Sequence, residues 1–226
     1  MIIGEIEVLR WLHILAMVYW LGGEWGVFQT SYNVVNPKLA LDERRRHMET
    51  AYRIDILART GIILLLPLGV HMGTLYGFVP WDRVWLIPMW IGFIAWLSLT
   101  WAAFLKRETD AGLLLTRIDE SLRYVLIPAL LLVGISSFLG YGPLAVGEGT
   151  LWYPAKIIVY GLMLVIGLGL RFIMRAWTVR FRRLAAGPDP REEAALKREI
   201  DIGRGLAYVY WVGIASVAFL GAVKPF

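Results

Sequence analysis

The 226-residue chain contains no cysteine and only three histidines, and charged residues make up 18% of it. Without cysteine there is no disulfide, no thiolate metal site, no iron–sulfur cluster, no cysteine nucleophile and no haem attached through C-x-x-C-H. Hydrophobic residues make up 58% of the chain, whereas ordinary soluble domains are about 45–50% apolar and about 25% charged. This composition excludes a disordered chain, a nucleic-acid-binding tail and an ordinary cytosolic enzyme.

What the chain has instead is six long stretches with few or no charges. Each is close to the ~20 residues that a helix needs to cross a bilayer core, and none shows the alternation of a membrane β-strand. The eleven tryptophans suit aromatic belts at the membrane interfaces. We therefore predict an all-α, polytopic membrane protein, with residues 1–226 forming a single bundle of six transmembrane helices. The predicted spans cover residues 8–28, 57–79, 84–105, 124–143, 151–175 and 205–223.

The basic residues are unevenly distributed among the connecting segments. Most of the 23 arginines and lysines lie between spans one and two, three and four, and five and six. By the positive-inside rule, these segments face the cytoplasm and both termini face the periplasm or the exterior. We predict a multi-pass protein of the plasma (inner) membrane. Residues 190–201 carry charges of both signs that could pair along a helix, and we predict a cytoplasmic surface helix there.

Two of the three histidines, His13 and His71, lie within predicted spans. His13 lies about one turn below Arg10, and His71 lies about two turns from the same surface on a helix that runs the opposite way. Ionisable residues inside a span are costly and indicate a functional site. Two imidazoles at one depth on antiparallel helices predict a b-type haem held by one ligand on each face of the iron.

Other residues near the histidines fit the same site. Arg10 could pair with haem propionates, and Met17 lies at i+4 on the face of the first histidine, where it could pack against the ring or ligate a metal. Gly69 and Gly73 would let a porphyrin approach the helix closely. Lys156 is the only basic residue well inside an apolar span. We predict that it is a catalytic cation for a carboxylate or a quinone oxygen, the alternative being a lysine that snorkels to the interface.

Two other interpretations use the same histidines. Imidazole and thioether sulfur are suitable ligands for Cu(I), and a copper site would draw on His13, Met17, His71 and Met72. The histidines could instead hydrogen-bond within a cofactor-free bundle that serves as a subunit of a larger complex. Nearer the cytoplasmic end, Glu24 is predicted to pair with Arg59, and a proton route from the cytoplasm to the haem level is the alternative.

Three segments resemble CopD/HemJ-type integral membrane proteins. The first is LRWLHILAMVYWLGGEWGVFQTSY, similar to their first helix with W-x-H-x-x-x-x-x-x-W-x-G-G. The others are HMETAYRIDILARTGIILLLPLGVHMG, similar to their basic loop and second helix, and LWYPAKIIVYGLML, similar to their W-x-x-x-K helix. The resemblance implies a haem-b-associated or copper-handling bundle, with His13 as the family's first-helix histidine and Lys156 as its helix lysine. HemJ-type members are implied to oxidise protoporphyrinogen, and CopD-type members to handle copper.

The residues thus predict a membrane-embedded haem b protein for electron transfer near the outer face. Its expected partners are the lipid bilayer, a quinone or porphyrin, and a periplasmic redox partner or larger membrane complex. An enzymatic version would be an oxidoreductase, protoporphyrinogen-oxidase-like or quinone-linked, with substrate near Lys156. Copper handling and a cofactor-free subunit are the alternatives.

Overall fold

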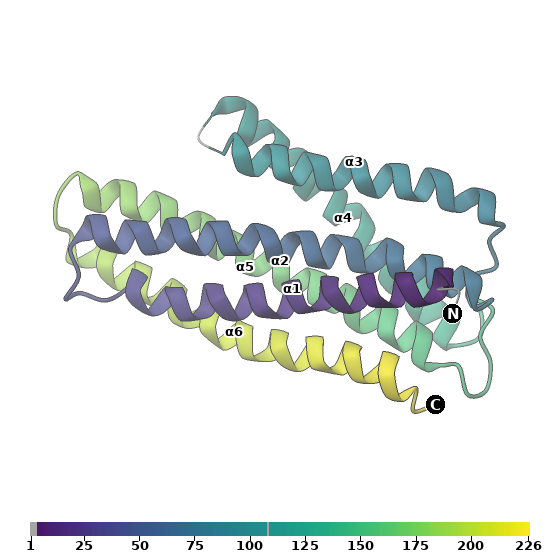
Figure 1. The fold of residues 1–226 in the computed structure, drawn as a ribbon. Coiled ribbons are helices and arrows are strands. Elements are labelled where there is room, and N and C mark those ends of the chain that lie inside the picture. Colours follow the sequence, from purple (N-terminus) through teal and green to yellow (C-terminus); the bar gives the residue numbers. More distant parts are fainter. Residues whose placement is uncertain (1–3, 108) are drawn as a thin grey trace.

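The computed structural model describes residues 4–107 and 109–226, which fold into six α-helices and one 3-10 turn without any strand in that part of the chain (Figure 1). The elements are α1 (Glu5–Val34), α2 (Leu41–Leu75), η1 (Arg83–Trp85), α3 (Leu86–Leu105), α4 (Asp110–Phe138), α5 (Trp152–Ala185) and α6 (Pro190–Val223). The prediction of an all-helical fold is therefore confirmed for the described residues.

Five helices, α2 to α6, are long and apolar enough to cross a membrane. The exception is α1, which contains Glu24, His13 and several glycines and aromatic residues that lower its mean hydropathy. At 30 residues it is nevertheless roughly 45 Å long, more than the ~30 Å of a bilayer core. The structure thus supports a multi-pass membrane protein, and the sixth span stays a prediction.

The two ends of the bundle differ. Both termini lie at one end, which we call the termini end, together with the α2–α3 and α4–α5 connections (Figure 1). At the opposite end α1 turns into α2, α3 into α4 and α5 into α6. Most of the arginines and lysines are near these three turns, and we call this the basic end.

The helices at the basic end extend beyond the predicted spans. The segment 190–201, predicted as a separate surface helix, is instead the first part of α6. The reason is packing as well as charge: Leu196 and Ile200 are buried against Met48 of α2 and Trp177 of α5 in a second apolar core. With 35 residues, α2 measures roughly 52 Å and therefore exceeds the ~30 Å of a bilayer core.

Small residues bring α1 and α2 into close contact along their antiparallel paths (Figure 1). A Cβ atom placed on Gly61 would lie 2.8 Å from the backbone nitrogen of Trp20, and would also collide with the carbonyl oxygen of Ala16. A Cβ on Gly23 would lie 2.7 Å from that of Ala58. Backbones that approach this closely need glycine, as is common between membrane helices.

Candidate functional site

A cavity of about 580 Å³ lies between α1, α2, α5 and α6 near the termini end, and we call it the large cavity. Its volume falls within the range of about 300–1,000 Å³ typical of small-molecule sites. Most of its wall is aliphatic or aromatic. The ionisable basic groups among its described lining residues are Arg10, His13, Lys156 and Lys224, and there is no aspartate or glutamate among them. The part of the wall that the structure describes is therefore apolar, with positive charge and without a carboxylate.

The imidazole of His13 lines this cavity from α1. Its Nδ1 atom is buried and has no hydrogen-bond partner among the described residues. Gly69 of α2 lies beside the ring, since a Cβ there would be 3.5 Å from the His13 Cε1 atom, an ordinary van der Waals contact. An imidazole without a protein partner is available to a ligand or a metal.

Lys156 reaches the same cavity from α5. The described residues provide no carboxylate within ion-pair distance of its ammonium group. Gly221 of α6 makes space for it, because a Cβ there would lie 2.6 Å from Lys156 Nζ. The prediction that this lysine lies in a site is thus supported by its position, and its chemical role stays a prediction.

The other two cations lie around Tyr76 at the mouth of the cavity. Arg10 Nη2 donates a 2.8 Å hydrogen bond to the Tyr76 hydroxyl. Lys224 Nζ lies 5.7 Å from the centroid of the Tyr76 ring and 5.2 Å from that of Trp152, in the range of cation–π contacts. These cations are at the termini end, where carboxylates of an amphipathic ligand would meet water.

Gly73, the second predicted glycine, also lines the cavity but makes room for a protein group. A Cβ at this position would collide with the hydroxyl group of Tyr153. That hydroxyl donates a 3.3 Å hydrogen bond to the carbonyl oxygen of Gly69. Gly73 therefore positions a tyrosine in the wall and does not open a surface for a porphyrin.

His71 is not among the residues that line the large cavity. Its Nδ1 accepts a 3.3 Å hydrogen bond from Trp90 Nε1 of α3, and its Nε2 lies 3.1 Å from a carboxylate oxygen of Glu5. Two positions along a helix correspond to a turn of about 200°. Because Gly69 and Gly73 face the cavity, His71 between them faces away from it. The structure therefore does not bring the two imidazoles together across one cofactor.

The copper ligands proposed from the sequence are partly assembled. Met17 and Met72 both line the large cavity with His13, while His71 does not. No group of three or more histidine, cysteine or acidic side chains suited to a metal ion occurs in residues 4–107 and 109–226. A copper site here would therefore depend on one imidazole and two thioethers.

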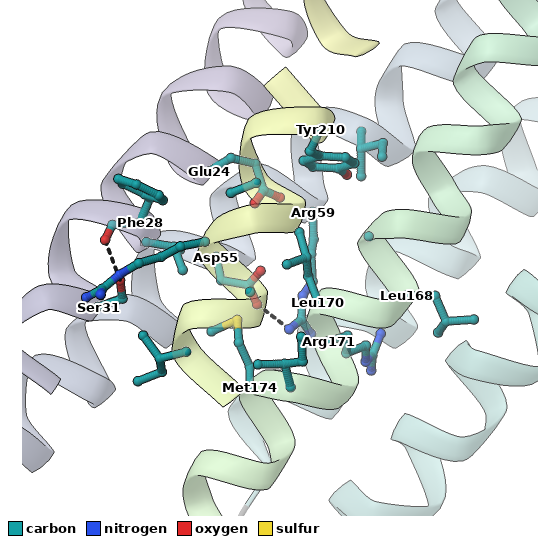
Figure 2. Close-up of a pocket in the computed structure, with 18 of the residues that line it drawn as sticks. Glu24, Phe28, Ser31, Asp55, Arg59, Leu168, Leu170, Arg171, Met174 and Tyr210 are labelled. Carbon is teal, nitrogen blue, oxygen red and sulfur yellow. Dashed lines mark hydrogen bonds and ion pairs between the residues drawn. The ribbon is translucent and has the colours of Figure 1, made fainter. Parts of the chain in front are cut away.

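A second, smaller cavity lies toward the basic end, and we call it the polar chamber (Figure 2). It has a volume of about 70 Å³, and Glu24, Asp55 and Arg59 contribute to its wall. Arg59 forms its ion pair with Asp55, one turn away on α2 (Figure 2). The predicted pairing of Glu24 with Arg59 is therefore replaced by a pair within one helix.

Three aromatic side chains separate the two cavities, and we call them the aromatic layer. Trp20 and Tyr160 line the large cavity, whereas Tyr210 lines the polar chamber. Trp20 Nε1 donates a 3.1 Å hydrogen bond to the Tyr210 hydroxyl, and the Tyr160 hydroxyl donates a 2.7 Å hydrogen bond to the carbonyl oxygen of Ile62. All three rings are buried, so the layer is a packed, hydrogen-bonded partition.

Sequence reasoning missed a buried charge network beside the chamber. Asp119 of α4 is fully buried and accepts hydrogen bonds from Trp96 Nε1 at 2.7 Å and Thr100 Oγ1 at 2.9 Å. It also pairs with Arg171 of α5 and with Arg123, one turn along α4. Asp119 and Arg123 precede the predicted span 124–143 and were expected in a connecting segment, whereas Arg171 falls near the end of the predicted span 151–175. The signal in the sequence was the i, i+4 spacing of Asp119 and Arg123 on α4, a helix that begins earlier than predicted.

Comparison with known proteins does not add a family to these observations. No family model, no curated protein and no solved structure matches the chain. The resemblance to CopD/HemJ-type proteins therefore stays a prediction that three short segments carry.

Proposed function

We propose that the chain is a membrane-embedded b-type haem protein that holds its porphyrin in the large cavity, with His13 as an axial ligand and electron transfer as its role. The observation that carries the proposal is the chemistry of the wall: an imidazole without a protein partner, a mainly apolar lining, and cations unaccompanied by a carboxylate. Haem has complementary features, since it is flat and apolar with two carboxylates at one edge and an iron that imidazole ligates.

The residues present fit one histidine ligand better than two. His71 has partners on both ring nitrogens and faces α3, so it has no role at the iron in this proposal. Met17 and Met72 are the other potential iron ligands that line the cavity. Arg10 and Lys224 at the mouth would pair with the propionates. When bound, the haem would supply one-electron redox chemistry.

The orientation in the membrane follows from charge. We propose that the basic end faces the cytoplasm, that α1 is the sixth span and that the host membrane is the plasma membrane. The large cavity would then be near the outer face, within reach of a quinone in the bilayer or a periplasmic redox partner. Lys156 lies inside this cavity, where its ammonium could bind a quinone oxygen or the carboxylate of a porphyrin substrate.

A copper-handling protein is the second candidate, favoured by the position of Met17 and Met72 in the same cavity as His13. Thioether and imidazole ligands suit Cu(I). The described lining residues include no aspartate or glutamate, which also suits a soft ion better than a hard one. This function predicts copper in the purified protein and no Soret band.

The deciding experiment is a visible spectrum, with metal analysis, of protein purified in detergent from membranes supplied with haem precursors and copper. We expect a Soret band with reduced α and β bands in the wild type, its loss in His13→Ala, and its retention in the matched control His71→Ala. Lys156→Ala should keep the haem and change its redox potential or its reaction with quinone. A colourless protein containing copper would replace haem by the second candidate, and a colourless protein without metal would refute both.

A further inference from the structure

One face of α1 connects the two cavities. Met17, Trp20 and Glu24 follow His13 at intervals of four, three and four residues, which places all four on one side of a helix. His13, Met17 and Trp20 line the large cavity, and Glu24 lines the polar chamber. Trp20 and Glu24 are only one turn apart, about 6 Å along the axis. A single stripe of α1 thus runs from the candidate haem site to an acidic side chain on the other side of the aromatic layer.

Glu24 differs from the other carboxylates near it because it has no ion-pair partner within 4 Å among the described residues. Each arginine in the chamber wall is already paired elsewhere: Arg59 with Asp55, Arg123 and Arg171 with Asp119, and Arg204 with Asp201 at 3.2 Å. The titratable and charged groups that line the chamber with Glu24 are Asp55 and Arg59 from α2, Arg123 from α4, Arg171 from α5, and Arg204 and Tyr210 from α6.

The chamber provides what proton exchange at a carboxyl group requires. A volume of about 70 Å³ exceeds the ~10–15 Å³ of probe-occupied space that one water molecule needs, and the polar walls can hydrogen-bond several. Figure 2 shows Glu24 and Asp55 projecting into the space between the helices, with Tyr210 beside Glu24. Toward the basic end the wall continues through Arg204, whose side chain is 17% exposed.

The aromatic layer closes the opposite side. Trp20 and Tyr210 are buried and hydrogen-bonded to each other, and the indole N–H of Trp20 donates and does not accept. Indole therefore cannot relay a proton between the chamber and the large cavity. The aromatic layer is thin and apolar. A charge in the large cavity and a charge in the polar chamber therefore interact electrostatically with weak screening.

We propose that the polar chamber is a proton-exchange site, in which the Glu24 carboxylate takes up one proton from water at the basic end, becomes a carboxylic acid and releases the proton by the same route. The aromatic layer holds this proton back from the large cavity. A change of charge in the large cavity shifts the proton occupancy of Glu24 through the layer. This coupling rests on the proposed haem function, whereas the exchange site itself does not.

The exchange site is tested on protein without any cofactor, in lipid vesicles, by infrared difference spectroscopy during pH changes. We expect a protonated-carboxyl C=O band that disappears as pH rises, that shifts in protein labelled with ¹³C-glutamate, and that is absent in Glu24→Gln. The control Glu43→Gln changes an exposed glutamate at the start of α2 and should keep the band. The exchange site would be overturned if the wild-type spectrum contained no carboxyl band that both titrates with pH and shifts with ¹³C-glutamate. This outcome decides the question even if Glu24→Gln fails to fold.

The coupling is tested separately by redox titration of the haem-loaded protein at several pH values. In the wild type the midpoint potential should fall as pH rises through the titration of Glu24, and Glu24→Gln should lose this part of the dependence. Equal pH dependence in both proteins would overturn the coupling while leaving the exchange site intact. Protein that binds no haem would refute the proposed function and the coupling together, whereas the infrared result would still decide the exchange site.

Discussion

Replacing Gly61 by alanine should loosen the contact between α1 and α2, on which both cavities depend. Adding one methyl group to a helix normally helps, since alanine is the better helix former by up to about 1 kcal/mol. At Gly61 the new Cβ would lie 2.8 Å from the Trp20 nitrogen and 3.3 Å from the Trp20 Cα, and closer still to the carbonyl oxygen of Ala16. These are backbone atoms of α1, so the clash cannot be relieved by rotating a side chain.

The size of the effect follows from the two opposing terms. Overpacking of a tight interior costs typically 1–3 kcal/mol, and the gain in helix propensity offsets up to about 1 kcal/mol of it. Because the clashing atoms are backbone atoms, the cost belongs in the upper part of this range, about 2–3 kcal/mol. We therefore expect Gly61→Ala to lower the free energy of unfolding by about 1–2 kcal/mol, roughly 2–8 °C in melting temperature for a chain of this length. The matched control is Gly22→Ala on α1, where a new Cβ meets nothing within 4 Å, and this substitution should be neutral or slightly stabilising.

The assay is thermal unfolding in detergent, followed by tryptophan fluorescence, of the two variants and the wild type purified side by side. The order of melting temperatures should be Gly22→Ala at or above the wild type and Gly61→Ala below it. If Gly61→Ala melts at the wild-type temperature or higher, α1 and α2 do not cross as closely as described. The positions of Trp20 and His13 relative to α2 would then need revision.

Three further predictions test other parts of the structure. Asp119→Asn should lower the free energy of unfolding by about 3–5 kcal/mol, because it leaves Arg123 buried without its ion-pair partner among the described residues and leaves Arg171 paired with Glu120 alone. Chemical or thermal denaturation measures the loss, and a wild-type midpoint would contradict the buried network. At the basic end, hydrogen bonds from Arg180 and Arg183 hold the pKa of Glu192 below its ordinary value. The stability that Glu192 contributes is therefore present at pH values above its pKa in the unfolded chain. This contribution is lost as pH falls through its lower pKa in the folded chain. Melting curves at decreasing pH should therefore converge for the wild type and Glu192→Gln, and curves that stay parallel would show that the ion pairs contribute nothing. Finally, Trp90→Phe should lower the free energy of unfolding by about 1 kcal/mol, because the hydrogen bond to His71 on α2 is lost. The visible absorption spectrum of the bound haem should not change, and a changed spectrum would indicate that His71 belongs to the haem site.

The helices themselves could be predicted from hydropathy, because bilayer thickness fixes the length of an apolar stretch. All six predicted spans coincide with helices, although the second and fourth extended a few residues past the helix ends at Leu75 and Phe138. The continuations at the basic end were not predicted. Their apolar residues, such as Leu196 and Ile200, are separated by many charged residues. The second apolar core at the basic end forms only when α2, α5 and α6 lie side by side, which the sequence alone does not show.

The sequence predicted the level of the candidate site along the helices, but it did not predict which face of each helix points into the site. His13 and Lys156 were assigned to one level, and both line the large cavity. The assignment of His71 considered only its depth. Its neighbours at two positions before and two after are glycines, and these face the cavity, so helical periodicity could have placed the histidine on the opposite face. The sequence offered no such check for Trp90 and Glu5, its partners from other elements.

Among the aspartate, glutamate, lysine and arginine side chains described in the bundle interior, Lys156 and Glu24 are the two for which no ion pair is found, and each lines a cavity. An isolated charge inside a membrane protein costs several kcal/mol unless it meets water, a partner or a ligand. Elsewhere the buried charges are paired, as Asp119 is with Arg171 and Arg123. A chain that satisfies its other buried charges so fully has no structural need for these two. Lys156 is therefore the group that the proposed anionic ligand would pair with, and Glu24 is the group that the proposed proton exchange would use.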